Sequence, residues 1–395
     1  MDQSIVDVTW TRGPNLPRPV KGQAQGQIGR RIVYACGFAF DTTGYERPAA
    51  SLSREDLDQL MRPRQIRFCA ETWMFDPATC QFTHLPDAPV GVFWAEGTAV
   101  GSDFYLLTGT MRSRANARFK GWQPGEKPDL TSPRIFRLRE SDSVWRWDEL
   151  PPMRIGRFIP SVAAVGTTLY VIAGAANFGA EPYSGDRPGP YINAVEALDL
   201  AHSESGWRDV APLPGLGRDG ASVAAAHGMI YVFGGFYDHI YHDQKRQGKF
   251  CGDAYRYDPG TRRWDQLPDL PFGLEAATAV TAFDRYILLI GGIHGGDRVE
   301  HPFTGDRSGK SRANLDIILF DTQHLSYRIL PTRLPPGPVN PFDPKYPESD
   351  PSSTAKGYWL TKASLIGDDT VYLLGGEVTD LAYSNCSHAM WIGRF

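Results

Sequence analysis

The stretch from Gly228 to Gly235, which reads Gly-Met-Ile-Tyr-Val-Phe-Gly-Gly, decides the fold of this chain. Its apolar, β-branched and aromatic run ends in two glycines, which predicts a short buried strand stopped by a turn. A strand of mostly small residues precedes it at 218–226, and two further strands follow at 254–259 and 264–268. Together these four segments predict one antiparallel sheet.

The same signal occurs six times along the chain. The copies end at Gly37, Gly109, Gly174, Gly235, Gly292 and Gly376. A second marker, an aromatic residue followed closely by Leu-Pro, alternates with the glycines. Its aromatic residues are Trp10, Phe82, Trp147, Trp207, Trp264 and Tyr327. Two markers in step, each in six copies, indicate a repeat architecture.

Composition excludes several classes of protein. The 395 residues include 41 Gly and 31 Pro, which favours many turns over long helices. The net charge of −4 favours neither a nucleic acid nor an anionic membrane as partner. The five scattered cysteines and the acidic start without a hydrophobic signal core predict a cytoplasmic protein with reduced thiols. We expect a monomer that binds a small molecule or a protein partner.

The ends of the chain predict how the repeats close. The last unit stops at its third strand, 389–395, and an extra strand, 6–10, precedes the first unit. Pairing these two segments in one sheet would close a ring and remove its free edges.

The glycine doublets, the aromatic markers and the Asp-Pro turns at 76–79 and 258–261 resemble the kelch motif. This resemblance covers nearly the whole chain and implies an all-β fold, a six-bladed kelch-type β-propeller closed by its terminal strands. The chain is then a single domain, 1–395. The expected blades span 18–87, 88–151, 152–214, 215–268, 269–331 and 332–395, the last completed by 1–17.

Strand direction places the long connections on one face of such a ring. They are the insertions 38–69, 110–133, 175–192, 293–314 and 332–356. Long loops in a compact domain are often functional, so we expect the ligand at the mouth on this face.

Alignment of the units on their glycines gives a ring of residues at this mouth. From it we choose Arg157, Arg218 and Glu275 as candidate catalytic residues, since two guanidiniums can hold a carboxylate while Glu275 moves protons. Salt bridges that tie the blades together are the alternative interpretation. The candidate ligand-binding residues are Gln23, Lys362, Asp219, Trp359 and Trp94.

Histidines in the long loops form a second group of candidates. They are His239, His242, His294, His301 and His388. Together with carboxylates they suggest an iron or zinc site, against the alternative that they are ordinary loop residues and that no cofactor is bound.

Three functions remain open at this stage. The chain resembles the bacterial sialic-acid mutarotases (N-acetylneuraminate epimerases), six-bladed kelch proteins, which implies an isomerase acting on a carbohydrate-like ligand at the central mouth. A kelch scaffold that binds a protein is the first alternative, and a metal-dependent lyase or tailoring enzyme that uses the loop histidines is the second.

Overall fold

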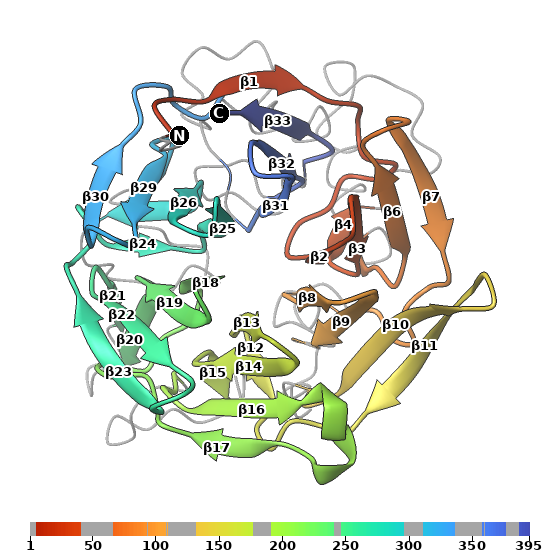
Figure 1. Ribbon diagram of the computed structural model, residues 1–395, viewed down its shortest axis with the longest axis horizontal. Coiled ribbons are helices and arrows are strands. Elements are labelled where there is room, and N and C mark those ends of the chain that lie inside the picture. Colours follow the sequence, from red (N-terminus) through yellow and green to blue (C-terminus); the bar gives the residue numbers. More distant parts are fainter. Residues whose placement is uncertain are drawn as a thin grey trace.

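The computed structural model describes residues 5–40, 66–92, 94–107, 109, 132–176, 191–240, 246–295, 311–335, 358, 360–376 and 387–395. Six four-stranded antiparallel sheets stand around a central axis (Figure 1). Helix is almost absent from this part of the chain, apart from the 3-10 segment Leu200–Ser205. The predicted six-bladed propeller is therefore confirmed, and we number its sheets as blades 1 to 6.

The first three blades each run from an inner to an outer strand. Blade 1 contains β2 (Ala24–Ile28), β3 (Arg31–Ala35), β6 (Thr72–Asp76) and β7 (Gln81–Leu85). Blade 2 contains β8 (Glu96–Val100), β9 (Asp103–Leu107), β10 (Ile135–Ser141) and β11 (Val144–Leu150). Blade 3 contains β13 (Ser161–Val165), β14 (Thr168–Ile172), β16 (Val195–Asp199) and β17 (Arg208–Val210).

The other three blades complete the ring. Blade 4 contains β18 (Ser222–Ala226), β19 (Met229–Phe233), β22 (Ala254–Asp258) and β23 (Arg263–Leu267). Blade 5 contains β25 (Thr278–Ala282), β26 (Tyr286–Ile290), β29 (Ile318–Asp321) and β30 (Ser326–Ile329). Blade 6 contains β31 (Lys362–Ile366), β32 (Thr370–Leu374), β33 (Met390–Arg394) and β1 (Thr9–Arg12).

The closing sheet confirms the predicted pairing of the two ends. Strand β1 pairs antiparallel with β33, so that Thr9 lies opposite Arg394 and Arg12 opposite Trp391. Just ahead of β1, the buried side chains of Ile5 and Val8 join the apolar cluster shared by blades 5 and 6. The N-terminal segment therefore stabilises the ring by strand pairing and by apolar burial.

The recurrence of the aromatic marker in each unit has a structural reason, because the marker links neighbouring blades. Trp147 of blade 2 donates its indole N–H to Pro86 O at the end of blade 1, at 2.9 Å. Trp207 makes the same bond to Pro151 O, at 2.9 Å, and Trp264 bonds to Ala211 O, at 2.9 Å. Each aromatic ring thus covers apolar surface and fixes its blade to the preceding one.

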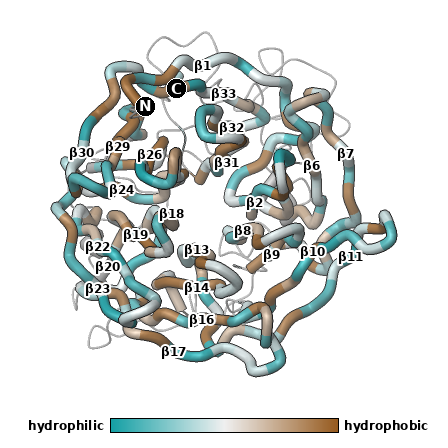
Figure 2. Tube along the Cα trace, viewed as in Figure 1, coloured by the Kyte–Doolittle hydropathy of each residue, from teal (hydrophilic) through white to brown (hydrophobic). Residues whose placement is uncertain are grey.

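Apolar residues recur in every blade, as the brown sections of Figure 2 show. The second strand of each blade is nearly continuous in apolar side chains, and these are buried between adjacent sheets. Strand β26, for example, is buried along its whole length. The core is therefore distributed around the ring.

The described parts of the insertions contain short extra strands. Strand β4 (Phe38–Phe40) pairs with β5 (Ile66–Phe68), and β20 (Phe236–Ile240) pairs with β21 (Arg246–Phe250). Strand β27 (Ile293–Gly295) pairs with β24 (Leu274–Glu275) and β28 (Ser311–Ala313), and β12 (Arg157–Phe158) pairs with β15 (Ala175–Ala176). Three insertions therefore begin and end as paired strands, and most of their remaining residues lie outside the described part of the chain. No helix among the described residues is long and apolar enough to cross a membrane.

Candidate functional site

The innermost strands of all six blades line an axial cavity of about 520 Å³. A cavity of this volume falls within the range of small-molecule sites. It begins at the ring formed by Ile159, Gly220, Ala276 and Leu360 and extends along the strands as far as Asp368, in the β31–β32 turn.

A collar of left-handed residues forms the end of this cavity nearest the insertions. Each blade contributes one, two positions before its innermost strand. They are Gly22, Trp94, Ile159, Gly220, Ala276 and Leu360, with φ angles between 44° and 60°. Backbone hydrogen bonds join neighbours in this collar, for example from Ala276 N to Gly220 O at 2.7 Å. Four of the six carry side chains in a conformation that disfavours them, so strain is concentrated at this end of the cavity.

The collar is packed with apolar side chains. Trp94, Ile159, Ala276 and Leu360, which come from four different blades, belong to one buried cluster. The indole of Trp94 meets the ring of Phe158 edge-on, with centroids 4.0 Å apart. The cavity therefore lies beneath an apolar layer, on the side away from the insertions.

The first residues of the six inner strands form a second ring, below the collar. In blades 3, 4 and 5 these residues are hydroxyl-bearing, and each bonds to the backbone of the next blade. Ser161 Oγ donates to Ala221 O at 2.7 Å, and Ser222 Oγ donates to Ala277 O at 2.9 Å. Thr278 Oγ1 accepts a hydrogen bond from Ala363 N at 3.0 Å. These hydroxyls join neighbouring blades.

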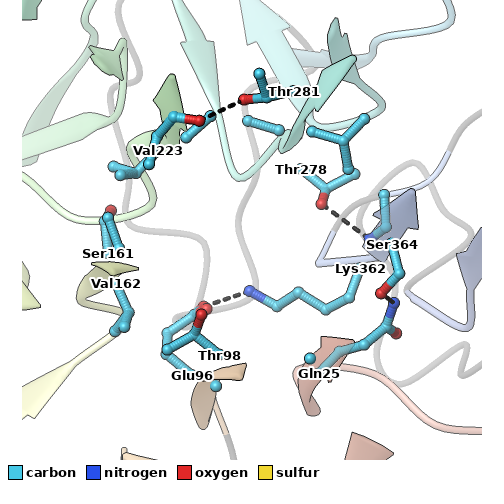
Figure 3. Close-up of a pocket in the computed structure, with 18 of the residues that line it drawn as sticks. Gln25, Glu96, Thr98, Ser161, Val162, Val223, Thr278, Thr281, Lys362 and Ser364 are labelled. Atoms are coloured by element: carbon cyan, nitrogen blue, oxygen red, sulfur yellow. Dashed lines mark hydrogen bonds and ion pairs between the residues drawn. The ribbon is translucent and has the colours of Figure 1, made fainter. Parts of the chain in front are cut away.

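In blades 6, 1 and 2 the first residue of the inner strand does not carry a hydroxyl group. Lys362 begins β31, Ala24 begins β2 and Glu96 begins β8. Figure 3 shows the Lys362 side chain extending across the cavity to the Glu96 carboxylate, with which it forms an ion pair. Beside this pair, Gln25 Nε2 donates to Ser364 Oγ at 2.9 Å. One wall of the cavity is therefore charged and polar.

The surroundings of Glu96 affect its ionisation. Burial raises the pKa of Glu96 above its usual range, and the neighbouring Lys362 ammonium opposes this effect only in part. A carboxyl group with a raised pKa can give or take a proton near neutral pH, which is the property expected of an acid–base group.

Arg157, a candidate catalytic residue, lies inside blade 3 and does not line the cavity. Its guanidinium is fully buried and pairs with Glu196 Oε1 at 2.5 Å. It also donates to the carbonyl oxygens of Ala173 and Ala194, at 3.1 and 2.6 Å. The structure thus places Arg157 in a salt bridge within its own blade, and its role in holding a ligand stays a prediction.

Arg218 has similar surroundings in blade 4. Its guanidinium is 1% exposed and forms two hydrogen bonds with Asp253, at 2.6 and 2.8 Å. A third bond goes to Gly234 O at 3.1 Å. Burial raises the pKa of Asp253, but the hydrogen bonds and positive charge of Arg218, together with the hydrogen bond from Tyr255, outweigh burial and hold this pKa below its usual range. Each arginine is therefore held in an ion pair within its own blade, and their joint binding of a ligand carboxylate stays a prediction.

The other charged candidates lie near the insertion face. Glu275 is 2% exposed and sits on β24, whose backbone pairs with β27. Asp219 is also buried, and its backbone bridges to Phe236. Gln23 is fully buried, and its Nε2 donates to Leu374 O at 2.9 Å. Among the ligand-binding candidates that the structure describes, Lys362 is the one that lines the axial cavity.

The remaining candidates are only partly described. Trp94 belongs to the apolar collar, and Trp359 lies outside the described residues. His242, His301 and the side chain of His239 lie outside as well. Phe272 packs against His294, with centroids 4.9 Å apart, and His388 lies beside β33, where its carbonyl accepts from Leu16 N. Among the described residues, no three His, Cys, Asp or Glu side chains are placed to hold a metal ion.

Sequence reasoning missed Glu96 and Gln25. The signal for Glu96 was available, because each first residue of an inner strand pairs with the residue two positions before the final glycine of its unit. Glu96 lies opposite Leu107 and Lys362 opposite Leu374 in this way. Comparison of the residues paired with this position in all six units would have placed Glu96 and Lys362 at the same level of the channel.

The fold and the cavity define a six-bladed β-propeller with a polar axial site. Residues 189–296 match the family model of the N-acetylneuraminate epimerases. The chain is 37% identical to the N-acetylneuraminate epimerase of Yersinia enterocolitica over 98 residues, which is 25% of this chain and 24% of that protein. It is 30% identical to the enzyme of the same name from Haemophilus influenzae over 142 residues, 36% of this chain and 33% of that protein. The predicted resemblance to this family is therefore confirmed, over a quarter to a third of the length of these relatives.

Proposed function

We propose that this protein interconverts the anomers of a small acidic sugar at the central mouth of the propeller. The observation that carries the proposal is the match of residues 189–296 to the N-acetylneuraminate epimerases. This segment contains all of blade 4 and the start of blade 5, and hence the candidate residues Arg218 and Glu275.

Interconversion of anomers needs only one group that accepts a proton and one group that donates a proton. A base takes the proton from the anomeric hydroxyl while an acid protonates the ring oxygen, so the ring opens to a carbonyl. Rotation about the neighbouring bond and the reverse proton transfers close the ring with the other configuration. No bond to carbon other than the ring C–O bond is broken, and one carboxyl group and a partner suffice.

Glu275 is the candidate proton-transfer group in this proposal. It precedes the collar residue Ala276 directly, so its backbone is held at the insertion-side end of the channel. A Cβ added to the neighbouring Gly220 would lie 3.0 Å from Glu275 Cγ, which shows how closely this carboxyl-bearing side chain is packed. Tight packing limits the rotamers of a catalytic side chain and so favours precise proton transfer.

The test is the rate of anomer exchange measured by proton NMR. N-acetylneuraminate is released as a single anomer from a glycoside, and its approach to equilibrium is followed with and without protein. We expect the protein to accelerate exchange and Glu275→Gln to remove about 10²- to 10⁴-fold of that acceleration. Glu149→Gln, on the outer strand of blade 2, is the matched control and should keep the full rate. Exchange no faster than in buffer, with the wild-type protein folded, would refute the proposal.

A further inference from the structure

We propose that the axial cavity binds a small carboxylate-bearing ligand, whose carboxylate replaces Glu96 as the ion-pair partner of Lys362. This site lies below the collar, apart from Glu275, and the inference holds whether or not the protein is a mutarotase.

The charged side chains that line the cavity favour a ligand that carries a carboxylate. Lys362 is the only cationic side chain among the described residues that line it. The anionic ones are Glu96 of β8 and Asp368 of the β31–β32 turn, while the lining parts of β2, β13, β18 and β25 carry no ionisable side chain. A ligand carboxylate entering the cavity has one ammonium group to meet, and that group is Lys362.

A buried acceptor beside the ion pair points to a ligand independently. Gln25 is 6% exposed and lines the cavity, and its Nε2 donates a hydrogen bond to Ser364 Oγ. Its Oε1 has no hydrogen-bond partner among the described residues. A buried acceptor without a donor is costly, and a ligand hydroxyl or amide N–H can supply the missing bond.

The opposite wall fits the remainder of such a ligand. Val162 of β13 and Val223 of β18 face the charged side across the opening, as Figure 3 shows. The lining there is completed by small residues such as Ala164, Ala225 and Ala279. A small molecule with its carboxylate towards Lys362 would therefore place its less polar part against valine and alanine side chains.

The release of Lys362 from Glu96 is coupled to the uptake of a proton by Glu96. An ionised Glu96 and a ligand carboxylate would repel each other around one cation, so Glu96 takes up a proton when the ligand binds. Burial already raises the pKa of Glu96 in the free protein, which makes this uptake easier. Binding strengthens as pH falls, by up to about tenfold per pH unit, until Glu96 is protonated in the free protein as well.

Two isosteric variants test the inference by calorimetric titration at about pH 5.5 and about pH 7.5. The probe is N-acetylneuraminate, and N-acetylglucosamine, which lacks the carboxylate, is the comparison. Lys362→Met should weaken binding of the acidic sugar at least about tenfold. Glu96→Gln removes the competitor for Lys362, so it should bind the probe at pH 7.5 at least as tightly as the wild type does and show little pH dependence. Arg333→Met and Asp316→Asn, which alter an exposed ion pair outside the cavity, should change neither result.

Three outcomes would overturn the inference. They are wild-type binding at neither pH, equal affinity for the uncharged sugar, or a loss in Glu96→Gln as large as that in Lys362→Met. The last would mean that the pair only clamps blade 6 to blade 2. If Lys362→Met fails to fold, the double variant Lys362→Met/Glu96→Gln removes the buried unpaired acid, and its loss of binding gives the same test. Absence of wild-type binding would also count against the proposed activity, because the probe is the substrate of that test. The other two outcomes concern the axial cavity alone and leave the proposed activity standing, because the titration does not read anomer exchange.

Discussion

Arg157 shows how the surroundings of one side chain decide its role. Its carboxylate partner, Glu196, is also fully buried and accepts hydrogen bonds from the backbone N–H groups of Arg154 and Ile155. The pair therefore joins the segment before β12 to the third strand of blade 3. An ion in such a position stabilises the fold only while its partner remains, because an unpaired buried charge is expensive.

The first prediction concerns this residue. Arg157→Ala should lower the free energy of unfolding by about 3–5 kcal/mol, since it leaves Glu196 buried without its cation. Arg134→Ala is the matched control, because Arg134 pairs with Glu149 in an exposed bridge, and it should cost about 0–1 kcal/mol. Urea unfolding of both variants measures the difference. Equal costs would contradict the structural role and would favour the predicted ligand-binding role of Arg157.

The limits of sequence reasoning are clearest at single residues. The ring of positions that holds Arg157, Arg218 and Glu275 follows from the glycine register, and the structure has these residues buried at the ends of their blades. The direction of each side chain did not follow, because these segments precede the inner strands and lack their regular alternation. Arg157 and Arg218 turn into the blades, where carbonyl groups and a carboxylate surround them. Lys362 lies on a regular strand and lines the cavity, while its role in ligand binding stays a prediction.

At the scale of the strand, the final glycines of blades 1, 4 and 5 are required for the same structural reason. Gly235 has a φ of 108°, and a Cβ there would lie 2.8 Å from Asp219 O. Gly37 and Gly292 show the same close approach, to Lys21 O at 2.8 Å and Glu275 O at 2.6 Å. Only glycine fits both the conformation and the space. The residue before it is left-handed too, and in blades 1 and 3 it is a buried Cys36 or Ala173. The sequence pattern therefore predicted these turns well.

Blades 1 and 2 approach each other closely through two further glycines. A Cβ on Gly26 of β2 would lie 2.9 Å from the backbone of Thr98 and Ala99 in β8. A Cβ on Gly97 of β8 would lie 2.9 Å from Ala24 Cβ and from the Phe104 ring. Strand β2 also contacts β31, so it lies between the strand that carries Lys362 and the strand that carries Glu96. Nothing in the spacing of the repeats indicated it, since it depends on how two neighbouring strands meet.

The second prediction follows from this contact. Gly26→Ala should destabilise the protein by about 1–3 kcal/mol, because the added methyl group meets backbone atoms that cannot move aside. Gly260→Ala is the control, since its Cβ would meet only the Asp258 carboxylate, at 3.2 Å, and its effect should stay within about 0.5 kcal/mol. Thermal unfolding of the two variants gives the comparison. A Gly26→Ala protein as stable as the wild type would show that the two strands are free to separate.

At the scale of the whole molecule, the ring depends on one non-local pairing. Five blades are each built from one continuous segment of the chain, whereas blade 6 needs β1 from the other end of the chain. The Asp7 carboxylate accepts hydrogen bonds from Thr332 N and Oγ1, at 2.9 and 2.8 Å, next to blade 5. The missing fourth strand in the last unit predicted this closure. The axial cavity could not be predicted in the same way, because its shape depends on all six inner strands at once.

Removal of the closing strand is the last prediction. A protein lacking residues 1–12 loses all of β1 and the buried side chains of Ile5 and Val8, and exposes the edge of β33 to other chains. We expect a lower unfolding temperature and self-association, because an unpaired edge strand and an uncovered apolar cluster favour both. Differential scanning calorimetry and light scattering measure the two effects. Val6→Ala is the control, since Val6 is 67% exposed and should have little influence. If the truncated protein stays monomeric with an unchanged unfolding temperature, the ring is held by contacts between blades, and the terminal pairing is dispensable.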